Sequence, residues 1–164
     1  MILCLAVLVA VTLRVAHRDT QRHGTVDSTE TTIATTVAAY SQKELEWMAI
    51  TIYREAGGDA CSDETRIMVG NVVLNRVASP SFPNTIYDVL TQPGQYAGVY
   101  DDIRWPVRAE LPEERHAVAR AYRCAERVLE GETLLPPNVV YQSNFRTLGS
   151  GVYKTADGMF FNYE

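Results

Sequence analysis

The chain has 164 residues, of which 46% are hydrophobic and 21% charged, and its formal net charge at pH 7 is -5. This length fits one domain of ordinary size, and the apolar content excludes a wholly disordered chain. The excess of acidic residues argues against a protein that binds the backbone of nucleic acids, and the three cysteines are too few for a small fold framed by disulfides.

Residues 1–16 differ in character from the rest of the chain. They hold an apolar run that only Thr12 interrupts, with basic residues after it. As a helix the run would be about 18 Å long, which is shorter than the ~30 Å hydrocarbon core of a bilayer. We expect residues 1–16 to be an export signal or a membrane anchor, which would place the rest of the chain outside the cytoplasm. Residues 17–40 are rich in threonine and lack periodicity, so we expect a linker before a folded domain at 41–164.

The first helix of the domain is predicted over residues 41–56. Ser41 and Glu44 have the spacing of a capping box, in which each side chain accepts a hydrogen bond from the other residue's backbone N–H. Apolar residues then recur every three or four positions, which is typical of an amphipathic helix. Gly57 and Gly58 are expected to end the helix in the left-handed conformation that glycine adopts at little cost.

Helical signals continue through the middle of the chain, and strand signals follow them. The further helical segments are 62–79, 86–90 and a long one bracketed by Pro112 and Gly131. The strand segments are 139–141, 152–153 and 159–163, and Asp157-Gly158 between the last two is a hairpin-turn pair. Helices first and strands last predict a small α+β domain with a short C-terminal antiparallel sheet.

Glu55 is the residue with the most distinctive chemical setting. It lies in the last turn of the first predicted helix, about 80° from the centre of the apolar stripe, where burial and the helix dipole would both raise its pKa. A carboxyl that stays protonated near neutral pH can act as a general acid on a glycosidic oxygen. Gly57 and Gly58 follow closely after Glu55 and would let a bulky substrate approach the backbone beside it. Gly58 is therefore a candidate binding residue. The pattern alone fits better with a solvated surface glutamate paired with Arg54 or Arg66, and both interpretations stay open.

Other polar residues carry weaker signals. Asn71 and Asn75 lie on one helix face, where they could bind a polar ligand or, as the pattern favours, cap neighbouring loops. Cys61 and His116 form the only pair with the residue types of a thiol dyad, although His116 lies on an outward helix face. A disulfide between Cys61 and Cys124 could form outside the cytoplasm, but spacing cannot establish it. No two histidines have the spacing of metal ligands, and no cofactor motif is present.

Six segments together resemble one known family. They are Ile52-Tyr-Arg-Glu-Ala-Gly-Gly58, Val69-Gly-Asn-Val-Val-Leu-Asn-Arg-Val77, Ser79-Pro-Ser-Phe-Pro-Asn-Thr-Ile86, Gln92-Pro-Gly-Gln-Tyr96, Tyr141-Gln142 and the closing stretch from Gly151 to Phe161. In this order and at these spacings they are similar to the SleB-like cell wall hydrolases, the family of spore-cortex-lytic enzymes. The similarity extends over about residues 43–163.

The resemblance implies a small lysozyme-like α+β fold that acts on the glycan strands of peptidoglycan. Members that cut the glycan do so as lytic transglycosylases, between N-acetylmuramic acid and N-acetylglucosamine. The family's catalytic glutamate falls on Glu55, and one carboxyl suffices for that mechanism. By the same resemblance Gln95, Tyr96 and Tyr141 line the glycan groove.

Two alternatives stand beside this expectation. The family label has also been attached to N-acetylmuramoyl-L-alanine amidase activity, which usually needs zinc or a nucleophile, and a non-catalytic module that binds wall glycan would also carry such a domain. The resemblance implies neither a metal nor an organic cofactor. We expect a monomer that works on the wall side of the membrane.

Overall fold

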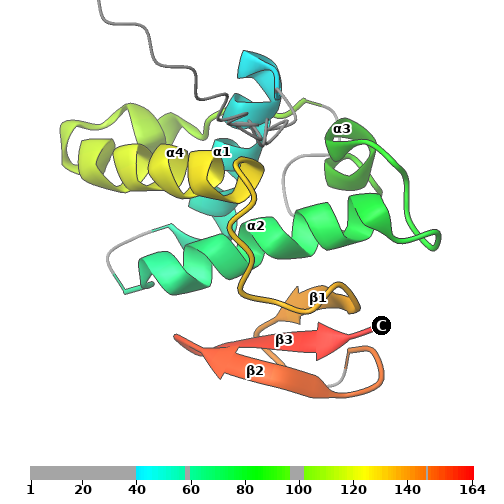
Figure 1. The fold of residues 1–164 in the computed structure, drawn as a ribbon. Coiled ribbons are helices and arrows are strands. Elements are labelled where there is room, and N and C mark those ends of the chain that lie inside the picture. Colours follow the sequence, from blue (N-terminus) through cyan, green and yellow to red (C-terminus); the bar gives the residue numbers. More distant parts are fainter. Residues whose placement is uncertain (1–39, 58–59, 97–101, 147) are drawn as a thin grey trace, which may run out of the picture. The chain divides into compact units, whose positions relative to one another are not determined.

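The computed structural model describes residues 40–57, 60–96, 102–146 and 148–164. The predicted export segment and nearly all of the predicted linker lie outside these residues. The elements are α1 (Gln42–Ala56), α2 (Asp63–Ala78), α3 (Ile86–Leu90), η1 (Val107–Glu110), η2 (Pro112–Glu114), α4 (Arg115–Leu129), β1 (Val139–Ser143), β2 (Val152–Ala156) and β3 (Met159–Tyr163). Helices precede strands, which confirms the predicted α+β class (Figure 1). Within the described ranges, no helix is long and apolar enough to cross a membrane.

Helix α1 begins as its sequence predicts and ends differently. The backbone N–H of Ser41 donates to the Glu44 carboxylate at 2.8 Å, and the Ser41 hydroxyl accepts from the Glu44 N–H at 3.2 Å, so the capping box is confirmed. Gly57 ends the helix with φ -70° and ψ 169°, which is extended and not the left-handed conformation that we expected. Glycine is required here by close approach, because a Cβ at Gly57 would lie 2.0 Å from the carbonyl oxygen of Tyr53.

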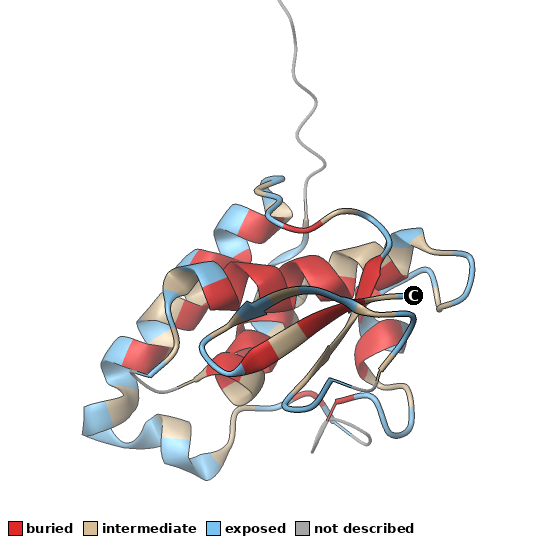
Figure 2. Ribbon diagram, turned by 90° about the horizontal axis from the view of Figure 1, so that it is seen from below, coloured by how far each residue is buried: buried red, intermediate tan, exposed pale blue. Residues whose placement is uncertain are grey.

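Helix α2 lies between the other helices and the sheet (Figure 1). Its buried positions surround almost its whole circumference, as expected for a helix packed on several sides. Gly70 permits a close approach to α4, since a Cβ there would lie 2.9 Å from a methyl group of Val128. Buried positions gather where the helices meet and along β3, the middle strand (Figure 2). Each large aliphatic side chain buried in such a core contributes about 1.5–3 kcal/mol.

The sheet has the strand order β1-β3-β2, with both neighbouring pairs antiparallel. The predicted hairpin turn joins β2 and β3: Asp157 has φ 47° and Gly158 has φ 81°, the two left-handed residues of the tight turn that suits the strand twist. Strands β1 and β2 each extend beyond the predicted segments. In β1 this extension includes Gln142, which pairs with Phe161 of β3.

Pro112 lies in the short 3-10 segment η2, and α4 starts only at Arg115, later than predicted. The side chain of Glu114, which precedes α4, cannot cap the helix because it accepts hydrogen bonds from the Tyr53 hydroxyl at 2.9 Å and from Arg108 at 2.5 Å. At the other end, Gly131 has φ 102° just past the last turn, as the sequence predicts.

Asparagine side chains of α2 hold the chain that leads from α4 into β1. The Asn71 amide donates to the Glu132 carbonyl at 2.8 Å, and its oxygen accepts from the Leu134 N–H at 2.7 Å. Asn75 donates to the Val139 carbonyl at 2.9 Å. The two asparagines therefore cap neighbouring backbone, which was the favoured interpretation of their spacing.

The hairpin is tied to the beginning of α2 by one carboxylate oxygen. Asp157 Oδ2 accepts from the Ser62 N–H at 2.7 Å, from the Ser62 hydroxyl at 2.7 Å and from the Thr65 hydroxyl at 2.6 Å. These hydrogen bonds, the one from Thr65 first, lower the pKa of Asp157 to about 2. The ionised carboxylate therefore joins two elements that are far apart in sequence.

We predict that Asp157→Asn destabilises the fold by ~1–2 kcal/mol at pH 7, because the charge-assisted hydrogen bonds are lost while asparagine still suits the left-handed turn. A lowered pKa gives stability that is present above the unfolded-state value of ~3.9 and is lost as the pH falls toward 2. The difference between the two proteins, measured by urea unfolding, should therefore shrink over that range. Thr65→Ser keeps the hydroxyl and is the matched control; a constant difference at all pH values would contradict the assignment.

Candidate active site

Glu55 lies in the last turn of α1 and is half-buried. The side-chain amide of Gln142, on β1, donates to Glu55 Oε2 at 3.3 Å. Burial raises the pKa of Glu55, and this effect exceeds the opposing influence of the Gln142 hydrogen bond and of the positive charges of Arg76 and Arg54. The result is a carboxyl group biased toward its protonated form and held by one oxygen.

Arg76, at the end of α2, is buried, and aromatic rings surround it. Its Nε donates to the Val140 carbonyl at 2.6 Å. Its guanidinium carbon lies 5.1 Å from the ring centroid of Phe82, 5.1 Å from that of Tyr96 and 5.8 Å from that of Tyr141. We call Phe82, Tyr96 and Tyr141 the aromatic cage of Arg76.

Tyr96 connects this cage to Glu55. It is 1% exposed, and burial raises its pKa to about 12, with Arg76 lowering and Glu55 raising it in smaller measure. Three buried polar atoms of this region have no hydrogen-bond partner among the described residues: the Tyr96 hydroxyl, Arg76 Nη1 and Gln142 Oε1. Buried polar groups are normally paired, and these three belong to Gln142, which donates to Glu55, and to Arg76 and Tyr96, which interact with it electrostatically.

The two arginines considered as surface partners of Glu55 have other contacts. Arg54 Nη2 donates to the Arg104 carbonyl at 3.0 Å. The guanidinium of Arg66 is buried and lies against the Cys61 carbonyl and, at 3.5 Å, the Asp63 carboxylate. Glu55 itself is half-buried and bonded to Gln142, which differs from a solvated surface glutamate.

The residues predicted to bind substrate fall in different surroundings. Gln95 is exposed, and its N–H donates to the Gln92 carbonyl at 3.2 Å. Tyr96 is buried beside Glu55. Tyr141 is half-buried, with its ring 6.2 Å from that of Phe82. Gly58 lies outside the described residues.

Sequence reasoning did not select Gln142 and Arg76, although both left a signal. Arg76 is a charged residue at a position that continues the apolar stripe of Val69, Val72 and Val73. Gln142 belongs to the quoted Tyr141-Gln142 motif, but no short pattern shows that its amide meets Glu55.

Cys61, Cys124 and His116 carried weaker signals in the sequence. Cys61 is half-buried and Cys124 buried; both are free thiols in this structure, and burial raises the pKa of Cys124 to about 11. A disulfide between them stays a prediction. His116 is exposed on α4. In the part of the chain that the structure describes, no three His, Cys, Asp or Glu side chains are grouped as metal ligands.

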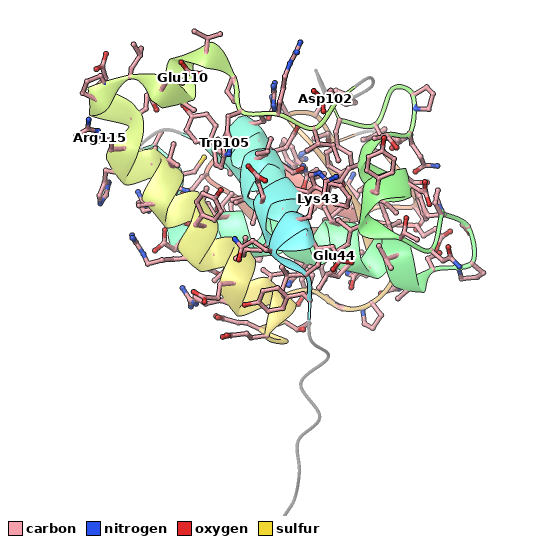
Figure 3. The ribbon with its side chains drawn as sticks, turned by 90° about the horizontal axis from the view of Figure 1, so that it is seen from above. Lys43, Glu44, Asp102, Trp105, Glu110 and Arg115 are labelled. Atoms are coloured by element: carbon pink, nitrogen blue, oxygen red, sulfur yellow. The ribbon has the colours of Figure 1, made fainter. Side chains whose placement is uncertain are left out.

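A separate pocket of about 270 Å³ opens beside α4. Its lining residues are Trp105, Ala109, Glu110, Val118 and Tyr122. Figure 3 shows Trp105 between α1 and α4, with Glu110 on the adjoining 3-10 segment. The Trp105 ring packs 5.5 Å from that of Tyr53 and 5.4 Å from that of Tyr122, and Glu55 is not part of this pocket.

The structure is a small α+β domain with a half-buried carboxyl group whose pKa is raised, a feature common at enzyme active sites. Comparison with known proteins identifies the family. The cell wall hydrolase family model matches residues 61–148, just over half of the chain. The chain therefore belongs to the cell wall hydrolase family, and it is SleB-like, as the sequence motifs predict.

Among curated proteins, the chain is 39% identical over 62 residues to a spore cortex-lytic enzyme of Bacillus cereus and 36% identical over 66 residues to that of Oceanobacillus iheyensis. These matches cover 38% and 40% of this chain but only 23% of each relative, so the chain spans about a quarter of their length.

Two solved structures share the fold. The catalytic domain of the germination-specific lytic transglycosylase SleB from Bacillus anthracis matches with a TM-score of 0.56 at 23% identity, over 76% of this chain and 97% of that one. The catalytic domain of the Bacillus cereus SleB protein matches with a TM-score of 0.54 at 25% identity, over 76% and 92%. The predicted fold class is confirmed by both.

We predict that Gly57→Ala lowers the rate of the peptidoglycan cleavage that we propose for this chain by ~10²-fold, because the new Cβ would displace the end of α1 and with it Glu55. Gly70→Ala is the matched control: its Cβ would meet the side chain of Val128 on α4 and not the backbone at the end of α1. It should lower the melting temperature while most activity remains. Equal losses of activity in the two folded variants would contradict the importance of the helix end.

We also predict that Glu55→Gln stabilises the protein at neutral pH. A carboxyl whose folded-state pKa is raised loses stability as the pH rises above its unfolded value of ~4.3, whereas glutamine does not titrate. The urea midpoint of the variant should exceed that of the parent at pH 7, and this gap should close near pH 4. A gap that widens toward low pH would show that burial does not dominate at Glu55.

Proposed function

We propose that this chain cleaves the glycan strand of peptidoglycan between N-acetylmuramic acid and N-acetylglucosamine as a lytic transglycosylase, with Glu55 as its single acid and base. The observation that carries the proposal is the half-buried Glu55 carboxyl, whose pKa burial raises. Family membership gives the class of substrate, and the SleB relative from Bacillus anthracis is itself described as a lytic transglycosylase.

The reaction needs one proton donor and returns that proton to its source. Protonated Glu55 gives its proton to the glycosidic oxygen as the bond from that oxygen to C1 of the muramyl ring breaks. The 6-hydroxyl oxygen of the same ring then bonds to C1, and its proton passes to the Glu55 carboxylate. The products are a free N-acetylglucosamine hydroxyl and a 1,6-anhydro-muramyl end, no water is consumed, and Glu55 is protonated again.

Gln142 fits this role as an orienting group. Its amide holds Oε2 of Glu55 at 3.3 Å, which leaves the other carboxyl oxygen to carry the proton toward substrate. Since an amide N–H donor favours the charged carboxylate, Gln142 also opposes an excessive rise of the pKa of Glu55.

The proposed substrate side of the site includes residues whose roles come from the family resemblance. Tyr141, which is half-buried, and Gln95, which is exposed, are positioned to be reached by a ligand, whereas buried Tyr96 would act from behind Glu55. Because peptidoglycan lies outside the cytoplasmic membrane, the proposal also requires export, and residues 1–16 are the segment that we propose for it.

We predict that Glu55→Gln lowers product release by ~10²–10⁴-fold, because the amide keeps the size of the side chain but cannot donate or accept the proton. Mass spectrometry of soluble muropeptides from purified peptidoglycan treated with the full chain should show 1,6-anhydro-muramyl ends. Glu113→Gln, which neutralises an exposed glutamate, is the control and should leave the rate unchanged.

Other products would contradict the proposed transglycosylation and indicate a different reaction. Reducing muramyl or glucosaminyl ends would indicate hydrolysis, with water in place of the 6-hydroxyl. Free stem peptides would indicate amidase activity. Full activity in Glu55→Gln would remove Glu55 from the chemistry altogether.

A further inference from the structure

Arg76 is a buried cation with unused hydrogen-bonding capacity. It is 3% exposed, and its one hydrogen bond to another described residue runs from Nε to the Val140 carbonyl at 2.6 Å. Its Nη1 is buried and has no partner among the described residues. Burying a charged group with an unpaired donor opposes folding, so an apolar residue would suit this position better if its role were only structural.

The aromatic cage explains how the charge is tolerated and held in place. The rings of Phe82, Tyr96 and Tyr141 lie 5.1, 5.1 and 5.8 Å from the guanidinium carbon. Each such contact attracts the cation to the face of the ring, and the rings also keep water away from it. The guanidinium therefore keeps a fixed position and a poorly screened charge.

The groups that act on Glu55 come from four parts of the fold. Arg54 is its neighbour on α1, but the Arg54 guanidinium is directed to the Arg104 carbonyl. Tyr96 approaches from the loop after α3, and Gln142 from β1. Arg76, from α2, is the larger of the two cationic influences on Glu55, and it is the one that is caged.

We propose that Arg76 is a positioning residue for the proposed transglycosylation: a caged cation that stabilises the Glu55 carboxylate formed between the two proton transfers. This inference rests on the proposed function, because it assigns a role within that reaction. An enzyme with one carboxyl must hold it protonated before bond cleavage and charged immediately afterwards. Burial favours the first state, and a fixed neighbouring cation favours the second.

The unpaired donor at Arg76 Nη1 gives this residue a second role, beside that of its charge. When Glu55 loses its proton, the carboxylate gains an acceptor site, and Arg76 Nη1 and the Tyr96 hydroxyl are nearby donors that lack other partners in the described part of the chain. In this proposal the unpaired atoms have a use, as donors available to the charged form of Glu55.

The test compares Arg76→Met, which keeps an unbranched side chain and removes the charge, with Arg76→Lys, which keeps the charge, in the full chain. On soluble uncross-linked glycan strands, Arg76→Met should lower kcat by ~10–100-fold with KM nearly unchanged. Since activity requires protonated Glu55, the rate falls as the pH rises through the pKa of Glu55. In Arg76→Met this fall in rate, the alkaline limb of the pH profile, should move to higher pH by about 1 pH unit. In Arg76→Lys it should move by less than half of that.

A second measurement does not depend on activity. Carbon-13 NMR of the Glu55 side-chain carboxyl, assigned by its absence in Glu55→Gln, should show the same upward shift of the titration in Arg76→Met. Phe82→Leu, which opens the cage but keeps Arg76, should show a smaller shift in the same direction and serves if Arg76→Met does not fold.

The outcomes separate the two proposals. An unmoved Glu55 titration and an unmoved pH limb in folded variants would make Arg76 structural and overturn the inference. Active Glu55→Gln would overturn the proposed function instead, whatever the NMR titration shows.

Discussion

The candidate site depends on the hydrogen bonds between α2 and the chain that leads into β1. Asn71, Asn75 and Arg76 bind backbone groups between residues 132 and 140. These contacts fix where β1 begins and therefore where the Gln142 side chain meets Glu55. Apolar packing alone would allow the strand to slide, whereas each of these hydrogen bonds is directional and would be lost by a slip of one residue. Glu55 and Gln142, which are 87 residues apart in sequence, thus meet through a helix that contributes Arg76 to the site.

Much of the fold could be predicted because its signals are local. The capping box at Ser41 and the turn at Asp157-Gly158 depend on neighbouring residues only, and both were predicted correctly. The conformation of Gly57 was not: it is extended, with φ -70° and ψ 169°, where a left-handed residue was expected. The late start of α4 was not predicted either: Glu114 is engaged by Tyr53 and Arg108, and no local pattern shows that competition.

The sequence predicts the part of the candidate site that lies on helix α1. Glu55 stood out by its place at the margin of an apolar stripe and near a helix end. Its partners did not, because Gln142 and Arg76 reach it from a strand and another helix, and the sequence does not encode that proximity in any short pattern. A charged residue inside an apolar stripe is nevertheless a usable sign, and Arg76 has it. The family resemblance supplied the chemistry that the residues alone left open.

Helix α2 is joined to the sheet at both of its ends. Its first turn binds the β2–β3 hairpin through Asp157, and its last turn binds β1 through Arg76. A rigid rod fixed at two points about 20 Å apart cannot rotate against the surface that holds it. The helical and β parts of this domain should therefore exchange their protected amide hydrogens together, as a single cooperative unit. Among the described residues, the Glu55 carboxyl of α1 and the Gln142 amide of β1 would then keep one fixed arrangement.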